Sequence, residues 1–484
     1  MSLNFKYVKD KSEKALADLS KKLQTGHARR MGGTENHFAM FQRLKIYQSY
    51  HISATYDREV VDPQLLFKSL RNIIVKNPFL ASAAVTQDIP YEIKPRPNDF
   101  LKVLDQVKFD DLVWDLRTEL KGLPLNKISE NLNHRILPYE DGKLFWRVGL
   151  IDNNTLAFMT NHVVHDGITA KNFFHDLTQE FNSKDPIEPV DIKNTPLFDY
   201  SKDITSKSLI PSSAESIIDY TPPNWYLPEF LTNLFIVNKI VDQTPSKPNE
   251  GSYFHTFNIN NEQISQIKSK LAKHSDPKGS RLTITSYLQN AWLHTGTKLK
   301  LYKNRLGYSG FVVPIDARRY FPSDTPQELY RYGLNTSGFV VHQYPVPELK
   351  WKTISTIDKY LKKLVNTKRS IFATGFFSSE KLLKDKHLDV DFLETSKFQY
   401  RGGTILTNIG IMGSNELVKD GYNIVDSVFS HHVNGLFYDF SILTVSTKAN
   451  GLNFVISAPK STGQEKLDQV GEEFKKIILS DDIV

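Results

Sequence analysis

The sequence contains no cysteine, and this absence excludes several kinds of chemistry. Without thiols the chain forms no disulfide, binds no zinc through thiolates and has no cysteine nucleophile. The opening residues, MSLNFKYVKDKSEK, are too polar for a signal peptide. No apolar run approaches the roughly 18 residues that a membrane-spanning helix needs. We therefore expect a cytoplasmic protein that does not span a membrane.

Several nucleotide and hydrolase motifs are missing as well. The sequence has no G-x-x-x-x-G-K-[ST] phosphate loop, no G-x-G-x-x-G after a strand and no G-x-S-x-G nucleophile turn. The net charge of +7 is concentrated in residues 1–45, which hold ten basic and four acidic residues. The rest of the chain is almost neutral and shows no basic face interleaved with aromatic residues. We expect no nucleic-acid partner.

The N-terminal segment, residues 1–24, is predicted to form a basic amphipathic helix. Apolar residues recur at helical spacing over about 5–23, with lysines on the other faces. Two interpretations remain open. The helix docks on the body of the protein, or it lies on an anionic membrane surface as a peripheral anchor at the endoplasmic reticulum or lipid droplets.

The length of 484 residues is too great for one hydrophobic core. Alternating strand and helix patterns predict an α/β protein with mixed sheets, divided into two halves at residues 25–200 and 251–484. Nine of the 23 prolines fall between residues 186 and 248, so residues 201–250 are interpreted as a proline-rich connector. The connector contains an apolar stretch, FLTNLFIVNKIV (230–241), which we interpret as a lid, a pocket lining or a membrane contact.

The stretch TNHVVHDG (160–167) joins a predicted strand to a predicted helix. Its His162 and Asp166 are spaced as His-x-x-x-Asp, and the same spacing recurs at His387 and Asp391 within the charged stretch KDKHLDVDF. We interpret that second copy as a solvated surface segment. A metal site is not predicted, because His162 and His165 lack the helical spacing of zinc ligands. The structural alternative is that Asp166 only caps the helix.

Two further histidines, His431 and His432, are adjacent in the sequence. If they lie on a strand, their side chains point to opposite faces. We therefore expect them to have structural roles.

The strand, NHVVHDG and helix together resemble the His-x-x-x-Asp-Gly motif of acyl-CoA-dependent acyltransferases with the chloramphenicol-acetyltransferase-like fold. Three further stretches resemble the fungal alcohol O-acetyltransferase family in the same order along the chain: GHARRMGGTENHFAMFQRLKIY (26–47), TITSYLQNAWL (283–293) and VVPIDARRYFP (312–322). The likeness extends from about residue 26 to residue 460 and is weakest in the connector. It implies two similar halves with a tunnel between them.

The resemblance also implies roles for individual residues. His162 is the expected general base in the tunnel, and Asp166 is expected to hold the loop by pairing with an arginine. Arg318 is the preferred partner and Arg319 the second choice, while Gly167 is expected where the chain turns tightly before the helix. The D-F-G-W-G motif of the plant branch is not reproduced, because YDFSIL (438–443) stands there. Position 161 is Asn where some relatives have a histidine.

The expected activity is transfer of an acetyl group from acetyl-CoA, a co-substrate, to small or medium-chain alcohols. No bound cofactor or metal is expected, and we expect a monomer. A donor for the oxyanion is expected on the TNIG turn at Thr407 or Asn408, although ordinary turn chemistry explains both residues equally well. Two alternatives remain: an N-acetyltransferase acting on an amine-bearing lipid such as a sphingoid base, and a non-catalytic, membrane-associated binding protein.

Overall fold

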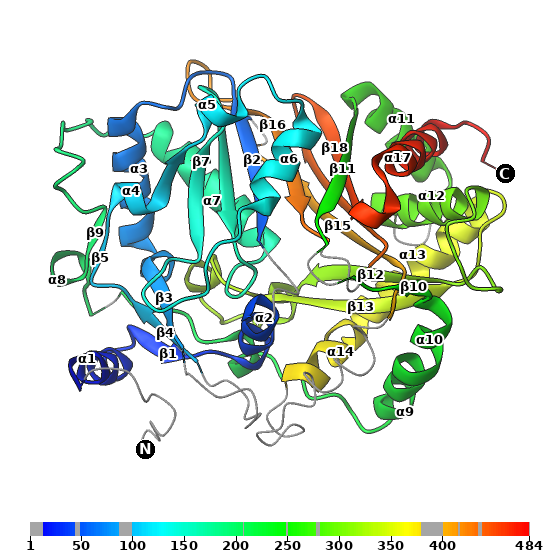
Figure 1. The fold of residues 1–484 in the computed structure, drawn as a ribbon, viewed down its shortest axis with the longest axis horizontal. Helices are drawn as coiled ribbons and strands as arrows, with labels where there is room; N and C mark the ends of the chain where they lie inside the picture. Colours follow the sequence, from blue (N-terminus) through cyan, green and yellow to red (C-terminus); the bar gives the residue numbers. More distant parts are fainter. Residues whose placement is uncertain are drawn as a thin grey trace.

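The computed structural model describes residues 13–43, 49–86, 99–206, 208–247, 250–276, 281–378, 400–414, 417–433 and 438–483. Two sheets organise these residues into two lobes (Figure 1). Both sheets mix parallel and antiparallel pairs, since β6 pairs with β7 and β15 with β17 in parallel while most other neighbours are antiparallel. The expected mixed α/β architecture is therefore present.

The first lobe is built on a five-stranded sheet in the order β16-β2-β8-β7-β6. Long helices flank the sheet, and a small three-stranded sheet in the order β1-β4-β3 lies beside it. The bounds are β2 Tyr50–Tyr56, β6 Val113–Asp115, β7 Trp146–Leu150, β8 Thr155–Thr160, α3 Pro63–Lys76, α6 Leu125–His134, α7 Gly167–Phe181, β1 Ala28–Arg30, β3 Ser82–Val85 and β4 Phe100–Val103.

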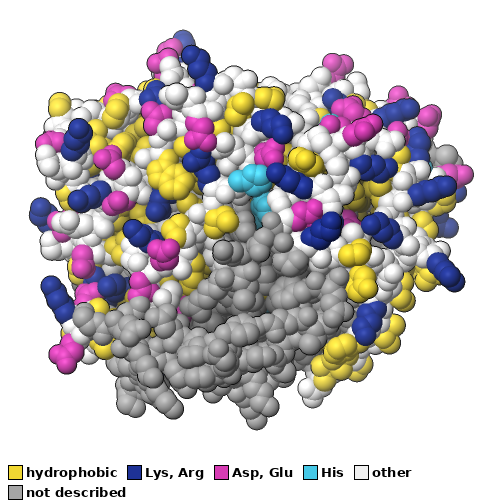
Figure 2. All heavy atoms as spheres, viewed as in Figure 1, with side chains coloured by type: hydrophobic (Ala, Val, Ile, Leu, Met, Phe, Trp, Pro, Cys, Tyr) yellow, Lys and Arg dark blue, Asp and Glu magenta, His cyan; other side chains and the backbone are white. Residues whose placement is uncertain are grey.

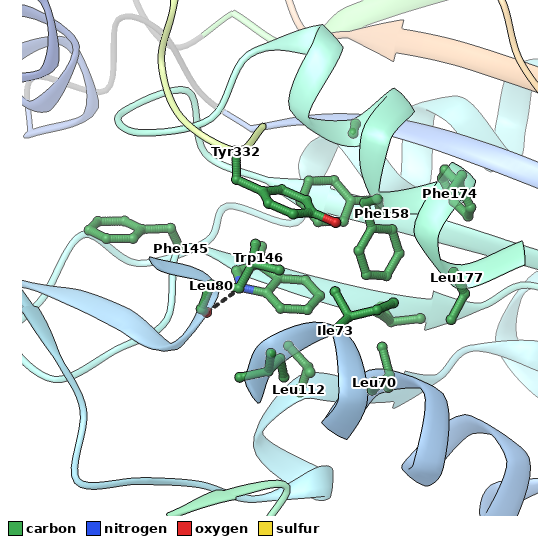
Figure 3. Packing of buried hydrophobic residues seen from close by; sticks show 14 of the residues in the cluster. Leu70, Ile73, Leu80, Leu112, Phe145, Trp146, Phe158, Phe174, Leu177 and Tyr332 are labelled. Atoms are coloured by element: carbon green, nitrogen blue, oxygen red, sulfur yellow. Dashed lines mark hydrogen bonds between the residues drawn. The ribbon is translucent and has the colours of Figure 1, made fainter. Parts of the chain in front are cut away.

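The core of the first lobe lies between this sheet and helices α3 and α7. Trp146 on β7 is fully buried among aromatic and aliphatic side chains, and its indole N–H donates a hydrogen bond to the Leu80 carbonyl at 2.8 Å (Figure 3). The apolar side of α7 is buried here, including Phe173, Phe174 and Leu177. This packing fixes the start of α7, where the His-x-x-x-Asp motif lies.

The second lobe contains a six-stranded sheet in the order β11-β18-β17-β15-β12-β13. Four long helices pack against it or against one another, and α14 contacts β13. The bounds are β11 Ser252–Ile259, β12 Ser309–Asp316, β13 Thr336–Gln343, β15 Thr404–Ile411, β17 Phe440–Thr447, β18 Gly451–Pro459, α11 Asn261–Lys273, α12 Ile284–Lys298, α13 Trp351–Asn366, α14 Arg369–Ser378 and α17 Gln464–Leu479.

One strand crosses between the lobes. After β15 the chain leaves the second sheet, forms β16 (Ile424–His431) beside β2 in the first sheet, and returns as β17. The expected division into residues 25–200 and 251–484 therefore does not separate the two sheets. This crossing joins the lobes next to the motif, because β2 also pairs with β8.

The N-terminal helix is described from residue 13 onward as α1 (Glu13–Gln24), and the predicted part before it lies outside the described residues. Leu19 is 1% exposed and packs with Ala28 and Phe100. The Lys22 ammonium group is buried and donates a hydrogen bond to the Val103 carbonyl. The described part of this helix therefore docks on the first lobe, as in the first of the two interpretations.

The proline-rich connector contains regular structure. Helix α9 (Tyr226–Thr232) continues through a π-helical segment at Asn233–Val237 into α10 (Asn238–Val241), which coincides with the apolar stretch read from the sequence. No helix among the described residues is both long and apolar enough to cross a bilayer. We call this continuous helical segment, residues 226–241, the connector helix.

Candidate active site

The motif loop, residues 161–166, begins where β8 ends and stops where α7 starts. Asn161, Val163 and Val164 are buried, and the two valines belong to the core of the first lobe. His162 between them is only half-buried. The loop is thus anchored by its apolar residues, and it presents one imidazole to the space between the lobes.

Aromatic rings enclose the His162 imidazole. Phe38, on helix α2 (Gly33–Arg43), stacks on it with ring centroids 4.6 Å apart and an interplanar angle of 11°, and the Tyr50 ring lies at 5.2 Å. Burial lowers the pKa of His162 from 6.5 to about 4, although the nearby Asp166 charge acts in the opposite direction. The imidazole is therefore neutral at physiological pH, which is the protonation state that a base requires.

The neighbouring motif histidine has different contacts. His165 is buried, its Nδ1 lies 2.8 Å from the Thr160 hydroxyl, and its ring contacts Phe79 and Phe158. Burial lowers its pKa to about 3. His165 therefore packs into the first lobe, and it does not line either pocket that His162 lines.

Asp166 uses both carboxylate oxygens. Its Oδ1 accepts a hydrogen bond from the Thr169 N–H and caps α7, while its Oδ2 accepts one from the Asn335 N–H at 2.8 Å and lies 2.9 Å from Arg318 Nη1. Burial opposes ionisation, but the Arg318 charge and the two backbone N–H groups hold the Asp166 pKa below its ordinary value. Helix capping and the arginine pair thus occur together rather than as alternatives.

The arginine pair joins the two lobes. Arg318 follows β12 in the second lobe, where its guanidinium also bonds the Tyr330 carbonyl and the Asp316 carboxylate. Arg319, the second choice from the sequence, is exposed and does not form this pair with Asp166. The Tyr50 hydroxyl donates a hydrogen bond to the Asp166 carbonyl at 2.6 Å and adds a further tie to the loop.

Gly167 differs from its expected role. It is the first residue of α7, and its backbone is not in the left-handed conformation that a glycine-dependent tight turn requires. A Cβ at this position would lie 3.1 Å from the Ile409 side chain on β15. Close approach of the second sheet, rather than a special turn, therefore explains the glycine.

The expected oxyanion donors lie on β15, which continues to Ile411 without the predicted tight loop. Thr407 and Asn408 line one of the pockets at His162, and the Asn408 side-chain oxygen accepts a hydrogen bond from the Gly410 N–H at 2.9 Å.

The side chains of the sequence neighbours His431 and His432 point in different directions, as expected. His431 lines the same pocket as Thr407, whereas His432 contacts the His134 ring. His387 and Asp391 lie outside the described residues.

Two pockets meet at His162. The first, here named the α2 pocket, has a volume of about 340 Å³ and lies between α2, the connector helix and β13. Its walls are mostly apolar and aromatic, with Phe38, Phe41, Tyr226, Phe230 and Phe339 among them. Such a pocket suits an apolar molecule with one polar end directed at the imidazole.

The second pocket, here named the α13 pocket, has a volume of about 530 Å³ and lies between α13, β15 and the motif loop. Its lining includes charged and polar side chains, with Arg319, Lys362, Asn366, Thr283 and Thr285 among them. His162, Pro314, Thr336, Phe339 and Ile405 line both pockets. The imidazole can therefore contact molecules that enter from two sides.

Sequence reasoning did not find Phe38 or Tyr50 as parts of this site, whereas a pocket lining was one of the three interpretations of the apolar stretch that forms most of the connector helix. Phe38 lies within the stretch that carried the family resemblance, but its stacking on His162 depends on where α2 packs. No local pattern reports a contact between residues so distant in the chain.

Comparisons with known proteins show which family and fold this chain resembles. The chain is 27% identical to alcohol O-acetyltransferase 2 of Saccharomyces cerevisiae, with 92% of this chain and 94% of that protein covered. It is 21% identical to the N-acetyltransferase SLI1 of the same yeast, covering 89% of this chain and 95% of that protein. Among solved structures, the trichothecene 15-O-acetyltransferase TRI3 from Fusarium sporotrichioides has a TM-score of 0.67 at 12% identity, covering 93% and 94% of the two chains.

A condensation domain of the CDA synthetase shares the fold at a TM-score of 0.59 and 12% identity, over 94% of this chain and 97% of that one. The two-lobed architecture is therefore that of the condensation and acyltransferase fold. The alcohol acetyltransferase family matches residues 30–479, which include both lobes and the motif loop. The chain belongs to the alcohol acetyltransferase family and is an acyltransferase.

Proposed function

We propose that this acyltransferase moves an acetyl group from acetyl-CoA to small or medium-chain alcohols, with His162 as the general base. The observation that carries the proposal is the position of His162, a neutral imidazole at the point where the α2 and α13 pockets meet. An activated thioester needs no covalent enzyme intermediate. A base that removes the hydroxyl proton during attack is sufficient, and such help is typically worth about 10²–10⁴-fold.

The two pockets fit different substrates. The α13 pocket has the exposed cation Arg319 in its lining, which suits a phosphate of acetyl-CoA, and it also contains Lys362, which is paired with Asp358. The aromatic α2 pocket suits the alkyl chain of the alcohol. In this arrangement the hydroxyl and the thioester carbonyl meet at His162. The oxygen attacks the carbonyl carbon, His162 takes the proton, and the imidazolium returns that proton to the departing thiolate.

An amine acceptor is the second candidate, because SLI1 of Saccharomyces cerevisiae is named an N-acetyltransferase and is similar over most of this chain. A primary amine attacks only when neutral, and a lysine-like amine has a pKa of about 10.4. Its rate therefore climbs with pH well beyond neutrality, while the rate with an alcohol levels off. Thiol release from acetyl-CoA, measured with a series of alcohols and amines across pH, tests both activities.

We also propose peripheral association with a membrane or lipid-droplet surface through the connector helix. The outer face of this helix exposes Leu227, Leu231, Phe235 and Ile236, and Trp225 directly before the helix is 58% exposed, as Ile236 is. Figure 2 shows hydrophobic side chains gathered at the lower right of the molecule, where Figure 1 places α9. The inner face of the same helix lines the α2 pocket. Contact of the outer face with lipid would bring apolar alcohols to the pocket wall.

A further inference from the structure

Ser441 lies in the second sheet, beside the point where the two pockets meet. On β17 its neighbours Phe440 and Ile442 face the core of the second lobe, so Ser441 and Leu443 face the opposite side, where both line the α13 pocket. Ser441 is paired directly with Ile405 on β15. Because Ile405 and His162 each line both pockets, Ser441 stands next to the place where the reacting groups meet.

The Ser441 hydroxyl is buried and has no hydrogen-bond partner within the part of the chain that the structure describes. Burying a hydroxyl without a partner destabilises a protein, and nearly all buried polar groups are satisfied. Neighbouring side chains of the same sheet follow this rule. The Ser457 hydroxyl donates to the His431 carbonyl at 3.1 Å, and the Thr404 hydroxyl accepts from the Trp292 indole N–H at 2.9 Å. The Ser441 hydroxyl is therefore an exception to this rule, and a bound ligand would supply the hydrogen-bond partner that it lacks.

We propose that Ser441 donates its hydroxyl hydrogen to the carbonyl oxygen of the bound acetyl thioester. This inference rests on the proposed acetyl transfer. As the alcohol oxygen bonds to the carbonyl carbon, His162 takes the alcohol proton and the carbonyl π electrons move onto oxygen, where the Ser441 hydrogen bond stabilises the negative charge. The carbonyl re-forms, the carbon–sulfur bond breaks, and the imidazolium proton passes to the thiolate. Ser441 keeps its own proton throughout.

The two donors expected from the sequence are less well placed. Asn408 is paired with Thr444, further along β15 from Ile405 than Thr407 is, and the strand becomes irregular between Asn408 and Ile411. Thr407 is paired with Leu443, one step further along the same face from the Ile405–Ser441 pair. Ser441 therefore stands closer in register to the shared wall of the two pockets.

The test is Ser441→Ala. We expect kcat to fall about 10²–10³-fold, as for the loss of other oxyanion donors. The KM for acetyl-CoA should change little, and the thermal midpoint should stay the same or rise slightly, because no hydrogen bond within the described protein is lost. Ser457→Ala is the matched control on the neighbouring strand, and it should lower the thermal midpoint with a smaller effect on kcat. Thr407→Val tests the rival donor.

A second measurement does not depend on turnover. With acetyl-CoA labelled with ¹³C at the carbonyl, the infrared stretch of the bound thioester should lie at lower frequency in the wild type than in Ser441→Ala, because a hydrogen bond weakens the C=O bond. An active wild type with undiminished kcat in Ser441→Ala, or an identical carbonyl frequency in the two proteins, would overturn the Ser441 assignment alone. A wild type that binds acetyl-CoA but acetylates neither alcohols nor amines would overturn the proposed function, and the infrared comparison would still decide on Ser441.

Discussion

Arg318, at the end of a strand in the second lobe, reaches across to Asp166 at the start of α7 in the first lobe, and their side chains approach to 2.9 Å. The pair is nearly buried, with the two side chains 10% and 5% exposed. The same carboxylate caps α7 and accepts the Asn335 N–H. One residue thus fixes the loop that carries His162 and ties it to the opposite lobe.

The first prediction concerns this pair. Asp166→Asn should lower the free energy of unfolding by about 3–5 kcal/mol, because it leaves the Arg318 charge buried without its partner. Asn caps helices as well as Asp does, so the variant removes the charge while keeping the cap. Because Arg318 keeps its contact with Asp316 at 3.1 Å, we expect a loss of unfolding free energy near the lower end of this range. Urea denaturation measures the change.

Arg319→Gln is the matched control for this prediction, since Arg319 is exposed one position away and does not contact Asp166. It should leave the unfolding midpoint unchanged. Equal stability of Asp166→Asn and the wild type would show that the pair does not hold the loop.

The second prediction concerns His162 itself. His162→Ala should reduce kcat by about 10²–10⁴-fold, the typical contribution of a general base, while acetyl-CoA still binds and the thermal midpoint moves little. His387→Ala, in the second copy of the spacing, is the control. If His162→Ala stays active and His387→Ala loses its activity, the general base is His387 in the second His-x-x-x-Asp spacing.

Much of this site was predictable from the sequence. Asp166 and Arg318, singled out from the motif and the DARR stretch, form an ion pair at 2.9 Å, and helices α3 and α12 begin directly after residues 62 and 283. Both helices are preceded by side-chain caps, Asp62 and Thr283, which act locally and are therefore visible in sequence. Local patterns report local structure.

Other features depend on contacts that no local pattern encodes. The crossing of β16 into the first sheet arises from pairing between residues more than 350 positions apart, such as Ser430 and His51. The pKa of His162 lies at about 4, below the ordinary imidazole value of 6.5, because Phe38 and Tyr50 pack around the ring and bury it. Gly167 serves close packing against Ile409 rather than a turn, which only the approach of the second sheet reveals.

The third prediction is the pH dependence of catalysis. A base must be neutral to accept a proton, and His162, with its pKa lowered to about 4, is neutral at any pH above that value. With an alcohol acceptor, kcat/KM should therefore stay level from neutral pH down to about 5 and fall only as the pH passes through about 4. If kcat/KM instead falls at acid pH with a midpoint near 6.5, the base is an imidazole exposed to water rather than the buried His162. Initial rates after a rapid pH jump measure this before any unfolding.

The fourth prediction is loss of stability in acid. Burial lowers the pKa values of His51, His165 and His432 to about 3, whereas in the unfolded chain they return to about 6.5. As the pH falls below about 6.5, the unfolded state binds protons that the folded state does not, so the free energy of unfolding decreases until about pH 3. Urea midpoints measured at pH 7, 5.5 and 4.5 should decline in that order.

His51→Gln isolates one of these groups. His51 lies on β2, away from the pockets at His162, and Gln does not titrate. The variant should take up about one proton fewer on unfolding at pH 4.5 and therefore show a shallower pH dependence of stability. An unchanged slope would mean that His51 is not among the groups responsible for the decline.

The last prediction concerns membrane contact. The apolar residues of α1 that the structure describes pack on the first lobe, so deleting residues 1–24 would remove the buried Leu19 and Lys22 and destabilise the protein. The outer face of the connector helix offers a cleaner target. Leu231→Gln with Ile236→Gln replaces two exposed apolar side chains that do not line the α2 pocket. Flotation with anionic vesicles should fall strongly for this double variant, while kcat with a short, water-soluble alcohol stays the same.

Leu123→Gln with Leu125→Gln, an equally conservative change at exposed leucines of the first lobe, should float as the wild type does. Wild-type flotation should also weaken at high salt if basic residues such as Lys239 contribute attraction to the anionic surface. If the connector variant floats as fully as its control, lipid binds elsewhere, and the connector helix serves only as a wall of the α2 pocket.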